Sequence, residues 1–330
     1  MSAGTQQVPI PWTPAPSTLV MAYSVCRGIT RTAAKNFYYA FLVLPRGKRE
    51  ALCAVYAFMR RCDDIADDAT LSLTERRQKL DAWLDALHRA QQGQPTDDAI
   101  LLALTHAQRR YQIPAGLLDE LAMGTAMDVE DVPDARGNQP LEPMSRQGGE
   151  TWGTPGIPGL TVQYRTFEDL RQYCYRVASV VGLVCIHVFG YRDPDAEPLA
   201  ERCGLAFQLT NIIRDVKEDA ALGRVYLPEE DLAKFGLSAS DLLSAPDAAR
   251  LRPVLALEAE RAREFYASGD ALIPYISEDS QPGLWVLVNI YRRLLDKIAQ
   301  KQYDVLNAKI ALSTWEKLRI LGKGFFKRLL

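Results

Sequence analysis

The sequence has 330 residues, of which 48% are hydrophobic and 24% are charged. Its 39 lysines and arginines nearly balance 41 aspartates and glutamates, and the formal net charge of −2 argues against a basic nucleic-acid-binding protein. The chain is long and apolar enough for a buried core, and its composition excludes general disorder, a collagen-like fibre and a coiled-coil fibre.

Cysteines and histidines are too scattered for a structural zinc site, because no two cysteines form a C-x-x-C pair and there are only three histidines. Sparse cysteines in a chain of this length are typical of reduced thiols in a cytoplasmic protein. Residues 1–20 show no secretory signal. The most apolar run, Val177–Phe189, is shorter than the roughly 20 residues of a membrane span.

Residues 1–20 are rich in proline and are expected to form a disordered arm. A single domain is expected over residues 21–321, because helical periodicity runs through most of it. In its first half, Pro45 precedes a run whose apolar residues recur at helical spacing. The helices expected there cover residues 48–68, 73–92, 97–111 and 114–131.

The helical pattern stops at a Pro- and Gly-rich segment, residues 133–158, which we expect to belong to a mobile loop over about 133–163. Thr166 and Asp169 then predict an N-terminal capping box. The helices expected after it cover residues 166–190, 197–220, 247–275, 283–303 and 306–321. No strand pattern of useful length and no internal repeat is visible, so the predicted fold class is all-α, with a basic amphipathic tail at 322–330.

The first informative motif is a group of aspartates at the end of the 48–68 helix. On a helix, Asp63 and Asp67 lie one turn apart on one face, and Asp64 and Asp68 do the same. Like charges at this spacing destabilise a helix by about 0.2–0.5 kcal/mol per pair. The pattern makes local sense if a cation neutralises some of these carboxylates.

A second motif lies on the 197–220 helix, where Asn211, Asp215 and Asp219 fall at i, i+4 and i+8. They form a stripe of oxygen donors about 12 Å long. Carboxylate and amide oxygens suit Mg²⁺, which is usually completed by water and substrate phosphates. Two such helices facing each other could grip a diphosphate through Mg²⁺.

Each motif alone is equally consistent with a solvated helix face. Both motifs follow apolar helical runs, and this favours a cavity over bulk water. Nearby cations are candidates for direct phosphate contacts, with a surface ion pair as the alternative for each. These cations are Arg60, Arg61, Arg214, Lys217 and Arg224.

Three blocks in this order resemble the squalene/phytoene synthase family, the head-to-head trans-prenyltransferases. They are the motif Asp63–Asp67, the block Tyr173–Gly182 and the string Gly204–Pro228. The resemblance covers roughly residues 22–312 and looks most like bacterial presqualene diphosphate and squalene synthases. It implies an isoprenoid synthase fold, a single-domain helical bundle around a central cavity.

The resemblance also implies roles for individual residues. The implied ligands of Mg²⁺, or of Mn²⁺ in its place, are Asp63, Asp67, Asn211, Asp215 and Asp219; the four aspartates together with Tyr173 are the candidate catalytic residues. The candidate substrate-binding residues are Lys35, Asn36, Phe37, Tyr56, Arg60, Gln208, Asn211, Arg224, Tyr226, Tyr291 and Lys309. Asn36 stands where the family usually has serine, and Lys309 is the nearest cation to a position where it often has arginine. Without the resemblance, core packing is the simpler reading of Tyr173.

The implied reaction joins two prenyl diphosphates. An allylic diphosphate ionises, the double bond of the second substrate attacks the cation, and loss of a proton near Tyr173 gives a cyclopropyl diphosphate. We expect two farnesyl diphosphates to give presqualene diphosphate or squalene, in sterol or hopanoid biosynthesis. The alternative is a phytoene synthase that condenses two geranylgeranyl diphosphates in carotenoid biosynthesis. NADPH is expected only if the product is reduced to squalene.

Two other classes of protein remain as alternatives. A catalytically inactive helical scaffold is disfavoured by the intact acidic motifs, and a terpene cyclase by the Tyr173–Gly182 block. The segment Leu318–Leu330 mixes basic and apolar residues, which predicts peripheral contact with the inner face of a membrane through the C-terminal tail. A frayed basic tail explains the same composition.

Overall fold

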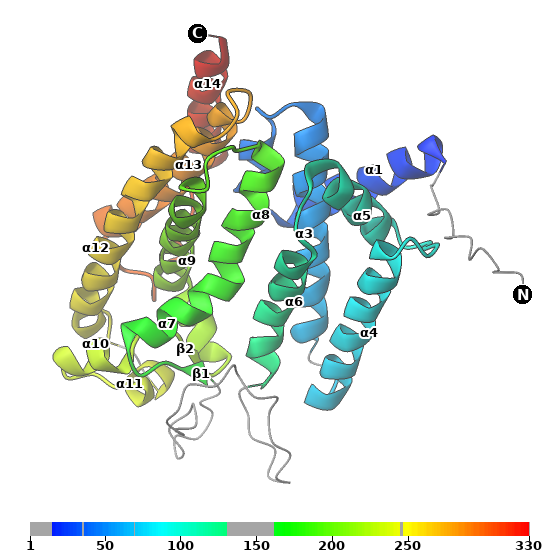
Figure 1. Cartoon of the computed structure of the whole chain (residues 1–330). Coiled ribbons are helices and arrows are strands. Elements are labelled where there is room, and N and C mark those ends of the chain that lie inside the picture. The colour runs from blue at the N-terminus through cyan, green and yellow to red at the C-terminus, as the bar shows by residue number, and fades with distance from the viewer. Residues whose placement is uncertain (1–14, 35, 69, 131–161, 245–246, 330) are drawn as a thin grey trace, which may run out of the picture.

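The computed structural model describes residues 15–34, 36–68, 70–130, 162–244 and 247–329. They confirm the all-α prediction and form a bundle of helices (Figure 1). The helices before the 131–161 gap are α1 (Pro16–Ala33), α2 (Phe37–Phe41), α3 (Arg46–Ala66), α4 (Leu73–Gln91), α5 (Ala99–Tyr111) and α6 (Ala115–Glu130).

The second half begins with one continuous helical run made of α7 (Phe167–Cys174), the π-helical turn η1 (Tyr175–Ser179) and α8 (Val180–Phe189). After it come α9 (Ala196–Ala221), α10 (Glu229–Lys234), α11 (Ala239–Ser244), α12 (Ala248–Leu272), the 3₁₀ turn η2 (Ile273–Tyr275), α13 (Gln281–Gln300) and α14 (Thr314–Leu329). Helix α9 packs against α8, α12 and α13, whereas α3 packs against α1, α5 and α6.

Local capping explains where the helices that carry the acidic motifs and Tyr173 begin. Pro45, in an extended conformation, precedes α3, because its fixed φ and missing N–H suit a helix start. The predicted capping box of α7 is confirmed: the Asp169 backbone N–H donates to Thr166 Oγ1 over 3.2 Å, and the Thr166 N–H donates to Asp169 Oδ2 over 3.0 Å.

Two glycines let the η1–α8 run approach α9 at backbone distance. A Cβ added to Gly204 would lie 2.5 Å from the carbonyl oxygen of Ala178, and one added to Gly182 would lie 2.6 Å from that of Ala200. No side chain fits at these distances. The close approach fixes the helix that follows Tyr173 against the helix that carries Asn211.

A short parallel sheet corrects the expectation that no strand forms. β1 (Val162–Gln163) pairs with β2 (Arg224–Val225), with Val162 opposite Arg224. Two residues per strand are too few for an alternating pattern to show in the sequence. The expected loop therefore ends before Val162, and residues 131–161 lie outside the described part of the chain.

Both ends of the chain also differ from expectation. Helix α1 begins at Pro16, so residues 16–20 are helical and do not belong to a disordered arm, while residues 1–14 lie outside the described chain. The helix expected over 306–321 is wrong, since Gln302 and Tyr303 are left-handed and α14 starts only at Thr314. Ser313 and Glu316 form a reciprocal side-chain cap there. The expected tail is helical through Leu329.

Residues 167–189 form one continuous helix, close to the range expected from the sequence. Its 23 continuous residues make it long and apolar enough to cross a membrane by length and composition, although 56% of its most apolar window is buried inside the bundle. A core helix meets the same criteria. All six cysteines are free, and five of them are buried.

Candidate active site

The first acidic motif lies at the C-terminal end of α3. Tyr56, Arg60, Asp63 and Asp67 succeed one another at helical spacing, with Asp67 as the C-cap residue, whose N–H donates to the Asp63 carbonyl over 2.8 Å. Asp63 is half-buried and Asp67 is exposed. Arg60 Nη2 lies 2.6 Å from Asp64 Oδ1, so this arginine pairs with the neighbouring aspartate.

The second motif lies in the last three turns of α9. Asp215 is half-buried and accepts hydrogen bonds from both Nε and Nη2 of Arg214, the former over 2.7 Å. Asn211 Nδ2 donates to Gln208 Oε1 over 3.5 Å. The amide oxygen of Asn211 itself, Oδ1, is buried and has no hydrogen-bond partner. A buried oxygen without a donor is costly in a folded protein, and a bound cation would satisfy it.

The two motifs lie at the same end of the bundle. Arg224, in β2 directly after α9, donates from Nη2 to Asp67 Oδ1 over 3.4 Å. In Figure 1 the C-terminal end of α3 points toward the lower end of the molecule, where β1 and β2 also lie. A second cation reaches the same region, since Lys309 Nζ lies 3.1 Å from Glu218 Oε1. Asp67 and Glu218 thus each lie beside a cation, Arg224 and Lys309 respectively.

An aromatic row connects α3 to α9 through α2 and α13. The ring centroids of Phe37 and Tyr56 are 6.4 Å apart, those of Phe37 and Tyr291 are 5.6 Å apart, and those of Tyr291 and Phe207 are 4.5 Å apart. Asn36 and Asn211 both hydrogen-bond to the Tyr291 hydroxyl, and burial raises the pKa of Tyr291. Burial likewise raises the pKa of Tyr56 to about 12, so both phenols are neutral at physiological pH.

Phe207 is a site residue that the sequence reasoning missed. It precedes Asn211 by one turn of α9, and this spacing is the signal that could have found it. Tyr291 was predicted as a substrate-binding residue, and it lies at the centre of the row, between Phe37 and Phe207.

Three tyrosines cluster where α7 meets the segment after β2. Tyr173 lies 5.4 Å from Tyr164 and 5.1 Å from Tyr226, and Tyr164 lies 6.2 Å from Tyr226, all between ring centroids. All three are buried. Tyr173 and Tyr226 were predicted from separate blocks, and the structure brings them into contact. Tyr164 was missed because it directly follows the segment expected to be a loop.

Some predicted residues lie elsewhere. Lys35 is outside the described residues. The Arg61 guanidinium lies 5.9 Å from the centroid of Trp83 on α4. Together with Asp64 and Asp68, Arg61 and Trp83 line a pocket of about 390 Å³ on the α4 side of α3. Lys217 Nζ donates to the Leu306 carbonyl over 2.7 Å.

A magnesium site here would need ligands beyond the protein. Among the described residues, no group of three or more His, Cys, Asp or Glu side chains lies close enough to hold a metal alone. Mg²⁺ is commonly bound by one or two carboxylates together with water and substrate phosphates. The unsatisfied oxygen of Asn211 and the carboxylates of Asp63, Asp67, Asp215 and Asp219 fit such a shared site.

Helices arranged in this way, with two acidic helix ends at one end of the bundle, define an isoprenoid synthase fold. The sequence model of the squalene/phytoene synthase family matches residues 30–316 of this chain. The chain belongs to the squalene/phytoene synthase family, and it is therefore a prenyltransferase of the head-to-head type.

Relatives and solved structures support this assignment. The chain is 35% identical over 327 residues to a 15-cis-phytoene synthase of Synechococcus elongatus, covering 95% of both chains. It is 35% identical over 303 residues to a phytoene synthase of Mycobacterium tuberculosis, covering 91% of this chain and 89% of that one.

Among solved structures, a dehydrosqualene synthase superposes with a TM-score of 0.77 at 27% identity, covering 93% of this chain and 96% of that one. The squalene synthase HpnC from Alicyclobacillus acidocaldarius gives a TM-score of 0.72 at 27% identity, covering 88% of this chain and 97% of that one.

Proposed function

We propose that this protein is a magnesium-dependent phytoene synthase that condenses two geranylgeranyl diphosphates. The observation that carries the proposal is the similarity to 15-cis-phytoene synthase over 95% of both chains. The choice reverses the expectation of farnesyl diphosphate, which the run Arg165–Leu183 suggested by its likeness to bacterial presqualene diphosphate synthases. A farnesyl-using synthase is the second candidate, supported by the dehydrosqualene and squalene synthases among the similar structures.

The proposed chemistry begins at the acidic end of the bundle. Asp63 and Asp67 on α3 and Asn211, Asp215 and Asp219 on α9 would hold Mg²⁺, which supplies positive charge to the departing diphosphate. Arg224 adds a cation beside Asp67, where it can donate hydrogen bonds to phosphate oxygens as the C–O bond breaks and its electron pair leaves with the diphosphate.

The allylic cation then needs an environment without water, because water would convert it to an alcohol. The aromatic row of Tyr56, Phe37, Tyr291 and Phe207 lies beside Asn211 and offers ring faces to a cation. Cation–π contacts of this kind contribute about 0.5–2 kcal/mol each. The double bond of the second substrate attacks C1 of the cation, and a proton leaves as the cyclopropane ring closes.

Tyr173 is the proposed residue for that proton transfer. It is buried in the cluster with Tyr164 and Tyr226, away from bulk solvent. The cyclopropyl diphosphate of the C20 series can proceed to phytoene by a second ionisation, rearrangement and proton loss. No reductant is consumed on this route, whereas reduction to squalene would consume NADPH.

One experiment separates the two candidates. The purified full-length protein is incubated with Mg²⁺ and either geranylgeranyl or farnesyl diphosphate, with and without NADPH, and the hydrocarbon is identified by mass. We expect a C40 product from geranylgeranyl diphosphate that does not depend on NADPH. A C30 product alone would support the second candidate, and no diphosphate release from either substrate would contradict both.

We also propose that α14 contacts an anionic membrane surface. One face of this helix packs against α13, where Leu321 is buried and Gly324 lies against Val286. Another face exposes Trp315, at 81% exposure, and Phe326, at 65%. The exposed basic residues Arg319 and Lys323 lie on the same helix, and this combination of aromatic and basic residues suits an anionic lipid surface.

Vesicles of anionic and neutral lipid test this contact by co-sedimentation. Point substitutions are preferable to truncation, since residues beyond Ile320 pack against the bundle. We expect Trp315→Ser combined with Phe326→Ser to lose binding to anionic vesicles. Met21→Ser on α1 is the matched control, because it also removes an exposed apolar side chain. Equal binding by all variants would contradict the proposal.

A further inference from the structure

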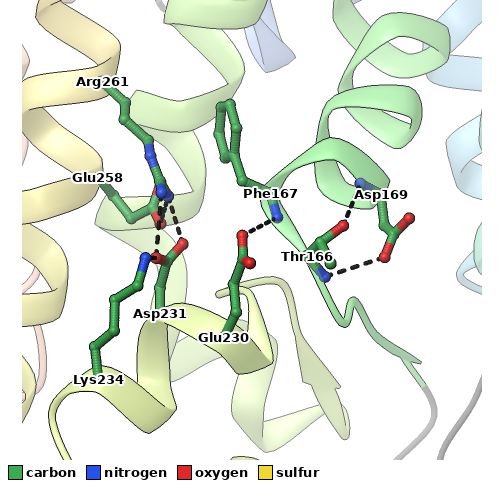
Figure 2. A network of polar contacts seen from close by, with 8 residues as sticks. All are labelled: Thr166, Phe167, Asp169, Glu230, Asp231, Lys234, Glu258 and Arg261. Atoms are coloured by element: carbon green, nitrogen blue, oxygen red, sulfur yellow. Dashed lines mark hydrogen bonds and ion pairs between the residues drawn. The ribbon is translucent and has the colours of Figure 1, made fainter.

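A buried ionic network joins α10 to α12 (Figure 2). Asp231 is fully buried and accepts hydrogen bonds from both Nη atoms of Arg261, with Nη2 at 3.1 Å from Oδ1. Arg261 Nη1 also donates to Glu258 Oε1 over 2.8 Å, and Lys234 Nζ donates to Asp231 Oδ1 over 2.7 Å. Glu258 is only 1% exposed.

Such a network is a costly way to fill a core. The free-energy cost of removing charges from water often exceeds the gain from their mutual attraction. Apolar residues of similar volume can therefore replace a buried ion pair without loss of stability. Removing one partner, by contrast, leaves an uncompensated charge. A network of this kind therefore calls for an explanation other than stability, and its position supplies one.

The network continues directly into the start of α7. The Arg261 guanidinium lies 4.3 Å from the centroid of the Phe167 ring. Next to Asp231, Glu230 accepts a hydrogen bond from the Phe167 backbone N–H through Oε1 over 2.8 Å. Figure 2 shows Phe167 between these two contacts, with the Thr166–Asp169 cap on its other side. The first turn of α7 is thus attached to α10 and α12 by side chains.

The same two segments carry the tyrosine cluster. Tyr173 follows Phe167 on α7, and Tyr226 precedes Asp231 in the segment that leads into α10. The backbone also joins them, because the Glu229 N–H donates to the Tyr164 carbonyl over 2.8 Å. Any shift of α7 relative to α10 would therefore change the contact between the Tyr173 and Tyr226 rings.

We propose that Asp231, Glu258 and Arg261 are positioning residues that fix α7 against α10 and thereby hold Tyr173 in place for proton transfer. The proposal rests on the proposed function of Tyr173. None of these three residues needs to touch the substrate. They act through the start of α7, at Phe167, and through the contact between Tyr173 and Tyr226.

Arg261→Met in the full-length protein tests the proposal. Because the proposed metal ligands and Arg224 are unchanged, we expect kcat to fall about tenfold or more while KM changes by less than about twofold. Arg263→Met is the matched control, since Arg263 lies on the same helix and pairs with Glu260 at the surface. Should Arg261→Met fail to fold, Arg261→Lys keeps the charge and loses the forked contact with Asp231, and it is measured instead.

A double-mutant cycle separates positioning from general destabilisation. If Arg261 acts through Tyr173, Arg261→Met should lower kcat by less than about twofold in the Tyr173→Phe background. If Arg261→Met lowers kcat by the same factor in the Tyr173→Phe background as in the wild type, the proposal is overturned. A rise in KM with unchanged kcat would overturn it as well.

Amide hydrogen exchange gives a readout that needs no turnover. We expect faster exchange in residues 167–174 of Arg261→Met than in Arg263→Met, with α3 unchanged in both. If the wild-type protein turns over neither prenyl diphosphate, the proposed function has failed, and exchange alone then decides whether the network holds α7. Equal exchange in the two variants would overturn the positioning role.

Discussion

Arg224 Nη2 lies 3.4 Å from Asp67 Oδ1, and this contact joins the strand after α9 to the end of α3. The two residues come from opposite motifs of the sequence, 157 positions apart. Asp67 is exposed and Arg224 is only 17% exposed in its side chain, so the cation is the better fixed of the pair. A diphosphate entering here would meet a cation already held in place.

Arg224→Gln should therefore weaken catalysis at the diphosphate end. We expect kcat/KM to fall by about 10- to 100-fold, because a charge-assisted donor to the leaving group is lost. The measurement is steady-state diphosphate release. Arg250→Gln is the control and should behave like wild type. Arg250 is an exposed residue of α12 that pairs with Asp241 of α11. Equal kinetics for both variants would contradict a diphosphate-binding role for Arg224.

Asp63→Asn and Asp215→Asn should each reduce turnover by at least about 100-fold, because each removes a charged ligand proposed for Mg²⁺. Far-UV circular dichroism should stay that of wild type. Asp81→Asn is the control, since Asp81 lies on α4 and pairs with Arg77. Full activity of either test variant, or equal loss in the control, would refute the assignment of metal ligands.

Tyr173→Phe should lower kcat by about 100-fold while KM changes by less than about twofold, because the hydroxyl is needed after the substrate has bound. The Tyr173 ring stays in contact with Tyr164 and Tyr226 in this variant, so folding should be unaffected. Tyr175→Phe, in the π-helical turn, is the matched control and should keep its kcat. An unchanged kcat in Tyr173→Phe would return that residue to a packing role.

Gly204→Ala should destabilise the fold by about 1–3 kcal/mol, because its Cβ would meet the backbone carbonyl of Ala178 at 2.5 Å and neither helix can move away alone. Gly28→Ala on α1 is the control: nothing lies within 4 Å of its added Cβ. That change should leave stability equal or raise it by about 0.5–1 kcal/mol. Chemical denaturation of both variants measures the difference, and equal stability would contradict the close-approach argument.

Glu258 should make stability fall with rising pH. Burial raises the pKa of Glu258 from 4.5 to about 8; Asp231 strengthens this shift and Arg261 opposes it. Between pH 4.5 and about 8, Glu258 therefore keeps a proton in the folded chain that it has released in the unfolded chain. The resulting stability is complete below pH 4.5 and is lost as the pH rises through about 8.

Thermal unfolding across this pH range tests the prediction. Lys234 and Cys174 also face the network and remain in both proteins under comparison. In the wild type, the free energy of unfolding should decline with rising pH by at most about 1.4 kcal/mol per pH unit. Glu258→Gln should remove this decline. If both proteins follow parallel curves, Glu258 does not titrate in this range.

Helical periodicity was sufficient to predict α3 and α9, because each buries an apolar face whose repeat is visible in the sequence. The spacing of Asp63 and Asp67, and of Asn211 and Asp215, also placed the acidic residues on helix ends that the structure brings to one end of the bundle. Those parts of the site depend on local spacing alone.

The parts that could not be predicted depend on contacts between distant segments. Phe207 and Tyr164 become site residues only because Tyr291 and Tyr226 come from elsewhere in the chain to meet them. The start of α14 is a different case. The Ser313-x-x-Glu316 signal was present and local, but the apolar pattern before it favoured an earlier start.

The π-helical turn Tyr175–Ser179 separates Tyr173 from Gly182 by one residue more than a regular α-helix would use for the same number of turns. Each residue of a helix rotates the chain by about 100°. Deleting a single residue here would leave the Gly182 end seated on α9 and swing the Tyr173 phenol to a different side of its own helix. The number of residues in this turn therefore sets the direction of the Tyr173 side chain, and an insertion or deletion within Tyr175–Ser179 should cost activity even if every other site residue is kept.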